Sequence, residues 1–81
     1  MRLDYSPQFL RSWDKAPAEV RQRFQKQAEF LRQNLRHPSL RAKKYDAVRD
    51  IWQARVDGSW RFYFQIRGDI YYLLNIAPHP K

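Results

Sequence analysis

The spacing of the apolar residues changes near residue 50, and this change constrains the fold more than any other feature of the sequence. Before it, one apolar series recurs every three or four positions, as a single stripe on an α-helix does: Val20, Phe24, Ala28, Leu31 and Leu35. After it, apolar and polar residues alternate, which is the pattern of β-strands with one buried face. Helices followed by strands predict an α+β domain.

The first half of the chain is predicted to hold a short strand and two helices. Residues 2–5 fit the strand, and Ser6–Pro7 is typical of a helix start because serine caps the helix and proline occupies its first position. We expect a short helix over residues 7–14. Ala16–Pro17 begins a second helix that His37–Pro38 ends, because a residue before proline disfavours the α conformation. Three apolar residues of the first helix are expected to be buried: Phe9, Leu10 and Trp13.

The second half predicts an antiparallel meander, preceded by a short strand around Lys43–Tyr45. Turns at residues 57–59 and 67–69 separate three alternating stretches. Opposed residues of an antiparallel pair share a face, so a register that keeps one face apolar can be chosen. At the first turn it pairs Val56 with Trp60, Ala54 with Phe62 and Trp52 with Phe64. At the second it pairs Ile66 with Ile70, Phe64 with Tyr72 and Phe62 with Leu74. The helices are then expected to pack on this one apolar face of a small antiparallel sheet.

The other face of the predicted sheet is open, basic and aromatic. It collects Gln53, Arg55, Arg61, Tyr63, Gln65, Tyr71 and Asn75. Arg55 stands directly opposite Arg61, and like charges paired across strands are destabilising. An anionic ligand would compensate for that repulsion.

The net charge favours a polyanionic partner. The 81 residues include 16 Lys and Arg against 8 Asp and Glu, which gives a formal charge of +8. One stretch without acidic residues holds Arg32, Arg36, Arg41, Lys43 and Lys44. A single run of this kind is usually a solvated face, but arginine also grips phosphate in a bidentate manner. Nucleic acid is therefore the leading partner, although an acidic protein would satisfy the same charge.

Composition also excludes several classes of protein. Absence of cysteine rules out disulfides, a thiolate nucleophile and Cys-ligated metal. Two glycines cannot form a Gly-rich nucleotide loop. The apolar run Ile70–Leu74 is too short to span a membrane, and Met1–Tyr5 lacks the apolar stretch of a signal peptide. We expect one cytoplasmic domain over residues 1–81, with no metal, no small-molecule cofactor and no membrane association.

An open face of arginines and tyrosines is compatible with RNA cleavage. The 2′-hydroxyl attacks the adjacent phosphate and the 5′-oxygen leaves, so the protein must supply positive charge and move protons. We assign Arg55 and Arg61 to the charge and His79 to proton transfer. Tyr63 or Tyr71 would stack on a base or assist with proton transfer. Each has a plainer interpretation: exposed strand arginines, a solvated histidine near the chain end, and tyrosines that fill the sheet surface.

Four short strings carry a resemblance to a known family: Ala42–Asp46 (AKKYD), Ile51–Val56 (IWQARV), Ser59–Phe64 (SWRFYF) and Asn75–His79 (NIAPH). Together with the order of the elements, they resemble the RelE/ParE toxin superfamily of bacterial toxin–antitoxin systems over nearly the whole chain. The resemblance implies a choice of activity. RelE-like members cleave mRNA in the ribosomal A site without a metal, whereas ParE-like members poison DNA gyrase.

The resemblance also implies site residues. Two alternate strand positions that are basic in the RelE branch correspond to Gln53 and Arg55, so one charge is replaced by an amide. Arg61 corresponds to the phosphate-binding arginine, and His79 to the basic residue after the last strand. The catalytic tyrosine of the family falls beyond Lys81, and neither Tyr63 nor Tyr71 takes its position.

We therefore expect the toxin of a type II toxin–antitoxin system, acting as a metal-independent, ribosome-dependent mRNA endonuclease. Its catalytic residues would be Arg55, Arg61 and His79. Its RNA-binding residues would be Gln53, Tyr63, Tyr71, Arg41, Lys43 and Lys44. The partners would be a cognate antitoxin, which lays an apolar or acidic segment over the helices or the basic face, and the ribosome with its mRNA. The alternatives are a ParE-like inhibitor of DNA gyrase and a non-catalytic scaffold that binds RNA or protein.

Overall fold

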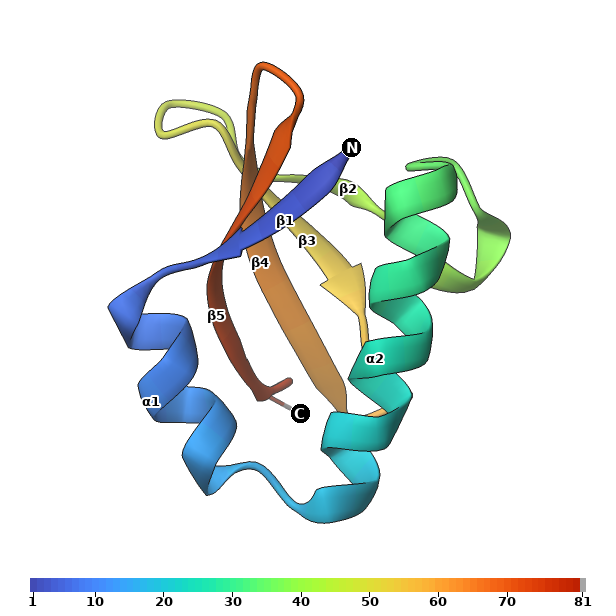
Figure 1. Cartoon of the computed structure of the whole chain (residues 1–81), viewed down its shortest axis with the longest axis vertical. Helices are drawn as coiled ribbons and strands as arrows, with labels where there is room; N and C mark the ends of the chain where they lie inside the picture. The colour runs from blue at the N-terminus through green and yellow to red at the C-terminus, as the bar shows by residue number, and fades with distance from the viewer. Residues whose placement is uncertain (81) are drawn as a thin grey trace.

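A strand, two helices and four further strands follow one another along the chain in a computed structural model that describes residues 1–80 (Figure 1). The elements are β1 (Arg2–Tyr5), α1 (Pro7–Lys15), α2 (Ala18–Gln33), the 3-10 turn η1 (Pro38–Leu40), β2 (Lys43–Asp46), β3 (Ile51–Arg55), β4 (Trp60–Arg67) and β5 (Ile70–Pro78). The predicted α+β class, with a short first strand and two helices, is confirmed.

The starts and ends of the helices follow local side-chain chemistry. Ser6 caps α1, since its Oγ accepts a hydrogen bond from the backbone N–H of Phe9 at 3.0 Å. The helix α2 ends at Gln33, before the predicted stop at His37–Pro38. The reason is Asn34, whose side chain accepts from the N–H of Arg36 at 2.9 Å and so competes with helical bonding.

The sheet is mixed, with strand order β1-β5-β4-β3-β2. The pairs from β2 to β5 are antiparallel, as predicted, whereas β1 joins the edge of the sheet parallel to β5. The backbone N–H of Ser6 donates to the carbonyl of Leu73 at 2.9 Å, and the Ser6 hydroxyl donates to the carbonyl of Leu74 at 3.0 Å. These contacts join the start of α1 to β5.

The core lies between the helices and one face of the sheet. The Phe24 ring of α2 lies 5.3 Å from Phe9 of α1 and 5.2 Å from Phe62 of β4, measured between ring centroids. The predicted stripe on α2 is buried at Val20, Phe24, Ala28 and Leu31. Leu10 is 51% exposed, contrary to prediction, because Phe9 and Trp13 share the inner face of α1.

The register of the first hairpin is confirmed. Trp52 pairs with Phe64, Ala54 with Phe62 and Arg55 with Arg61. The N–H of Val56 donates to the carbonyl of Trp60 at 3.0 Å and closes the loop over residues 57–59. The Arg55–Arg61 juxtaposition therefore exists.

The predicted register of the second hairpin is wrong by one residue. Arg67 pairs with Ile70 around a two-residue loop. Gly68 takes its first position with φ of 61°, where hairpin turns favour glycine. Instead of Tyr72 and Leu74, the buried residues of β5 are Tyr71, Leu73 and Ile76. A bulge at Tyr63–Phe64 then shifts the pairing, so that Phe62 lies opposite Ile76.

Candidate nucleic-acid interface

A cationic pocket lies on the open side of the sheet, between β2, β3, β4 and the segment that follows β5. Its volume is about 330 Å³. It is lined by Arg41, Lys43, Gln53, Ala54, Arg55, Arg61 and His79. The structure thus brings together the three predicted catalytic residues and three of the predicted RNA-binding residues. No carboxylate lines the pocket within residues 1–80, so its electrostatics favour an anion.

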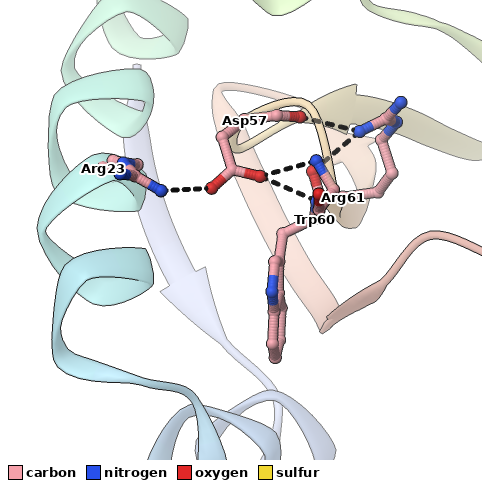
Figure 2. A network of polar contacts seen from close by, with 5 residues as sticks. Arg23, Asp57, Trp60 and Arg61 are labelled. Carbon is pink, nitrogen blue, oxygen red and sulfur yellow. Dashed lines mark hydrogen bonds and ion pairs between the residues drawn. The ribbon is translucent and has the colours of Figure 1, made fainter.

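Arg61 is the anchored cation of this pocket. Its residue exposure is 7%. Its Nη1 donates to the carbonyl of Asp57 at 2.8 Å and to the carbonyl of Trp60 at 3.0 Å (Figure 2). Both bonds use the same nitrogen, which leaves Nε and Nη2 able to donate to a phosphate. A guanidinium held in this way loses little side-chain entropy when an anion binds.

Asp57 fixes the turn that holds Arg61. Its Oδ1 accepts from the backbone N–H groups of Ser59 at 2.8 Å and Trp60 at 2.9 Å, and its Oδ2 accepts from Nη1 of Arg23 at 2.8 Å (Figure 2). Partial burial raises the pKa of Asp57, but the N–H groups of Ser59 and Trp60 and the Arg23 guanidinium lower it by more, so its pKa lies below the usual value. The carboxylate therefore links α2 to the turn beneath Arg61.

The lowered pKa of Asp57 predicts a loss of stability in acid. A carboxyl whose folded pKa is below its unfolded value of about 3.9 stabilises the fold above that pH, and this contribution is lost as the pH falls through the folded pKa. Asp57→Asn is expected to lower the unfolding free energy near neutral pH and to flatten its dependence on pH below about 4. Urea unfolding of both proteins across this range measures the difference, and parallel curves would contradict it.

Arg55 adds a second cation to the pocket, opposite Arg61. The nearby charge of Arg41, then desolvation by burial, then the charge of Arg61 lower its pKa from the usual value for arginine. Arg41 has φ of 47°, a left-handed conformation that is uncommon for residues other than glycine. Arg41 is the C-cap of η1, a position where helical turns commonly take this conformation, and its guanidinium is the third that lines the pocket.

His79 stands exposed at the rim of the pocket. Its backbone N–H donates to the carbonyl of Ser59 at 2.7 Å, which fixes this segment beside the loop over residues 57–59. The imidazole thus belongs to the same pocket as Arg55 and Arg61. His37, the other histidine, has a structural place: it caps η1 by accepting from the N–H of Ser39 at 3.2 Å and stacks on Phe30.

Gln53 and Tyr63 form a polar pair beside the cations. Gln53 is 6% exposed, and its Nε2 donates to the hydroxyl of Tyr63 at 3.2 Å. The Tyr63 ring meets the ring of Tyr45 edge to face, with centroids 5.0 Å apart. Tyr45 is a surface aromatic that the sequence prediction missed. No alternation pointed to it, because the bulge between Lys44 and Asp46 makes Tyr45 an extra residue of the strand.

Two predicted RNA-binding residues lie elsewhere. Tyr71 is 4% exposed and meets Phe64 edge to face in the core, where burial raises its pKa, so its predicted place on the open face is wrong. The register shift at the second hairpin is the cause. Lys44 lies outside the pocket: its ammonium is 5.0 Å from the Trp52 ring centroid and forms an ion pair with Asp50.

In the described part of the chain, residues 1–80, no helix has the length and apolar character needed to cross a membrane. Over the same residues, no three His, Asp or Glu side chains gather in a way that could hold a metal ion.

Solved structures share this fold, although no protein-family model and no curated protein matches the sequence. The YoeB/ParE toxin from Agrobacterium tumefaciens superposes with a TM-score of 0.82 at 10% identity, covering 99% of this chain and 100% of that one. The archaeal RelE–RelB complex from Pyrococcus horikoshii gives 0.77 at 17% identity, with 95% and 92% covered. YafQ from E. coli gives 0.77 at 15% identity, with 95% and 91% covered. Because the likeness spans the whole chain at such low identity, what the molecules share is architecture: this chain has the RelE-like fold of these toxins.

Proposed function

We propose that this chain is the toxin of a type II toxin–antitoxin pair and that it cleaves mRNA bound to the ribosome. The observation that carries the proposal is the cationic pocket, where Arg41, Arg55, Arg61 and His79 meet with no carboxylate among the lining residues in the range 1–80. The RelE-like fold supports it, because several structures of similar fold are described as toxins or as toxin–antitoxin complexes.

The pocket supports cleavage through the RNA's own 2′-hydroxyl. The scissile phosphate binds to Arg61 and Arg55, which stabilise the charge that develops on the pentacoordinate phosphorus. The 2′-hydroxyl gives its proton to solvent water as its oxygen attacks phosphorus. The bond from phosphorus to the 5′-oxygen breaks, and the products are a 2′,3′-cyclic phosphate and a 5′-hydroxyl. The imidazolium of His79 donates the proton that the leaving 5′-oxygen takes up.

The partner in this proposal is an antitoxin. Two of the solved complexes pair RelE with RelB, one from Methanococcus jannaschii and one from E. coli. We infer that a protein with an acidic segment covers the cationic pocket of this chain, since its formal charge of +8 needs neutralising in a tight complex. Such a partner would block the site where the phosphate binds.

The test is cleavage of a defined mRNA on programmed ribosomes, with mapping of the new 5′ ends. We expect cuts at the A-site codon that need ribosomes. Cleavage of the same mRNA in the absence of ribosomes would contradict the ribosome dependence. Inhibited growth without any cuts would contradict the nuclease, and trapped gyrase–DNA complexes in that case would support a gyrase inhibitor. Folded protein without cuts or growth inhibition would point to a binding scaffold.

His79→Ala is expected to slow this cleavage by about a hundredfold, within the range typical of a general acid. The variant should also lose the fall in rate toward alkaline pH that a general acid contributes, whereas His37→Ala should keep it. Single-turnover cleavage on ribosomes across pH measures both effects. An unchanged profile with a lowered rate would show that His79 acts by position and not by proton transfer.

A further inference from the structure

An aromatic pair, the exposed Tyr45 and the half-buried Tyr63, lies on the open face, outside the cationic pocket. Tyr45 is 60% exposed, although tyrosine rings normally bury most of their surface. It is the extra residue of a bulge, since the register of β2 with β3 shifts between Lys44 and Asp46. Bulges re-aim side chains near functional sites, and this one brings the Tyr45 ring edge to face with Tyr63 of β4.

The tyrosines line a second hollow of about 510 Å³. Its other walls include Asn75, Pro78 and the ion pair of Arg49 with Asp46. The hollow adjoins the cationic pocket through one hydrogen bond: Gln53 lines the pocket, and its amide donates to the hydroxyl of Tyr63, which lines the hollow. A phosphate in the first site and a planar group in the second would therefore be neighbours.

The polar chemistry of the hollow fits a nucleobase. The Tyr63 oxygen accepts from Gln53, so its own hydrogen is available to donate to a base edge. The exposed Tyr45 ring offers a stacking surface, which every base can use. An acidic peptide would use the neighbouring cations but has no need for a bare ring beside a hydroxyl donor.

We propose that this hollow is a nucleobase site for single-stranded RNA. The base of a nucleotide next to the phosphate in the cationic pocket stacks on Tyr45, and the Tyr63 hydroxyl donates to an acceptor on its edge. Gln53 is the positioning residue that orients the hydroxyl. This inference rests on the proposed function, because it places a base of the RNA whose phosphate binds in the cationic pocket.

The experiment measures binding of a short labelled single-stranded RNA by fluorescence anisotropy, without ribosomes. The RNA carries a 2′-deoxy sugar at the reacting position, so that it is not cut. A second RNA lacks one base at the following position. We expect wild-type protein to bind the abasic RNA at least about fivefold more weakly, as loss of one stacked base predicts.

Variants at Tyr45 complete the test. Tyr45→Ala should bind the intact RNA at least about fivefold more weakly than wild type and should make no distinction between intact and abasic RNA. Tyr45→Phe should keep the discrimination, since it keeps the ring. Val48→Ala, in the adjacent loop and 97% exposed, is the matched control and should behave as wild type.

Several results would overturn the base site: equal binding of the two RNAs by wild-type protein, equal discrimination by Tyr45→Ala, or no RNA binding at all. Weakened binding of a polyglutamate peptide by Tyr45→Ala, with RNA binding unchanged, would assign the hollow to a peptide. If Tyr45→Ala cleaves mRNA on ribosomes at the wild-type rate and wild-type protein shows no base discrimination, the base site is wrong but the proposed nuclease stands. If wild-type protein discriminates between the two RNAs but does not cleave mRNA on ribosomes, the base site is supported and the proposed nuclease activity is wrong.

Discussion

Arg61→Ala is expected to lower the rate of mRNA cleavage on ribosomes by about a hundred- to a thousandfold, the usual effect of removing one preorganised donor from a developing anion. Arg61 is 7% exposed and is tethered to two backbone carbonyls of the 57–60 turn. Its charge is therefore in place before the substrate arrives. Single-turnover measurements at saturating enzyme give the chemical rate and separate it from binding.

Arg61→Lys is the informative companion to that variant. Lysine keeps the charge but loses the planar fork that bonds to the turn and to phosphate together, so we expect a rate between those of wild type and alanine. Arg67 lies on the same strand as Arg61, but its guanidinium stacks 4.2 Å from the ring centroid of Tyr72 on β5. Arg67→Ala should therefore leave cleavage unchanged. Full activity of folded Arg61→Ala would remove Arg61 from the catalytic site.

The part of the site that the sequence predicted is the part that depends on the first hairpin. In residues 52–66 one alternating set is apolar and the other is mostly polar, and a loop over residues 57–59 satisfies both. The Arg55–Arg61 juxtaposition followed directly from that register and is present in the structure. Strong two-faced alternation determines pairing because a slip of one residue would expose the whole core face.

In the second hairpin, the alternation of apolar and polar residues does not determine the register. In Ile70–Leu74 both alternating sets are apolar, so either register buries a hydrophobic face. The choice was made by Gly68, whose positive φ supports a two-residue loop, and by the bulge that realigns β4 with β5. Tyr71 consequently lies in the core.

The contacts of the side chains that hold the site in place could not be predicted from the sequence pattern either. Asp57 was recognised as a turn residue, but its hydrogen bond with Arg23 of α2 depends on how the helix lies over the sheet. Tyr45 was obscured because a bulge, which breaks the alternation, determines its orientation. Patterns of period two or 3.6 report the face on which a residue lies, and contacts between distant elements require the fold.

Gln27 is the clearest of these hidden supports. It is 6% exposed on α2, and its Nε2 donates to the carbonyls of Arg55 at 2.9 Å and Ser39 at 3.1 Å. Its Oε1 accepts from the Ser39 hydroxyl at 2.9 Å. One amide thus joins α2, η1 and the end of the strand that carries Arg55.

Gln27→Leu is expected to lower the unfolding free energy by about 3 kcal/mol, because it leaves partly buried carbonyls and a hydroxyl without partners. Gln22→Leu, an exposed change of the same kind on the same helix, should alter stability by less than about 0.5 kcal/mol. Urea unfolding measures both. Because the lost donor frees the carbonyl of Arg55, the folded fraction of Gln27→Leu should also cleave more slowly than Gln22→Leu. Wild-type stability in Gln27→Leu would show that water replaces the amide, and reduced stability with an unaltered rate would show that Arg61 alone positions the phosphate.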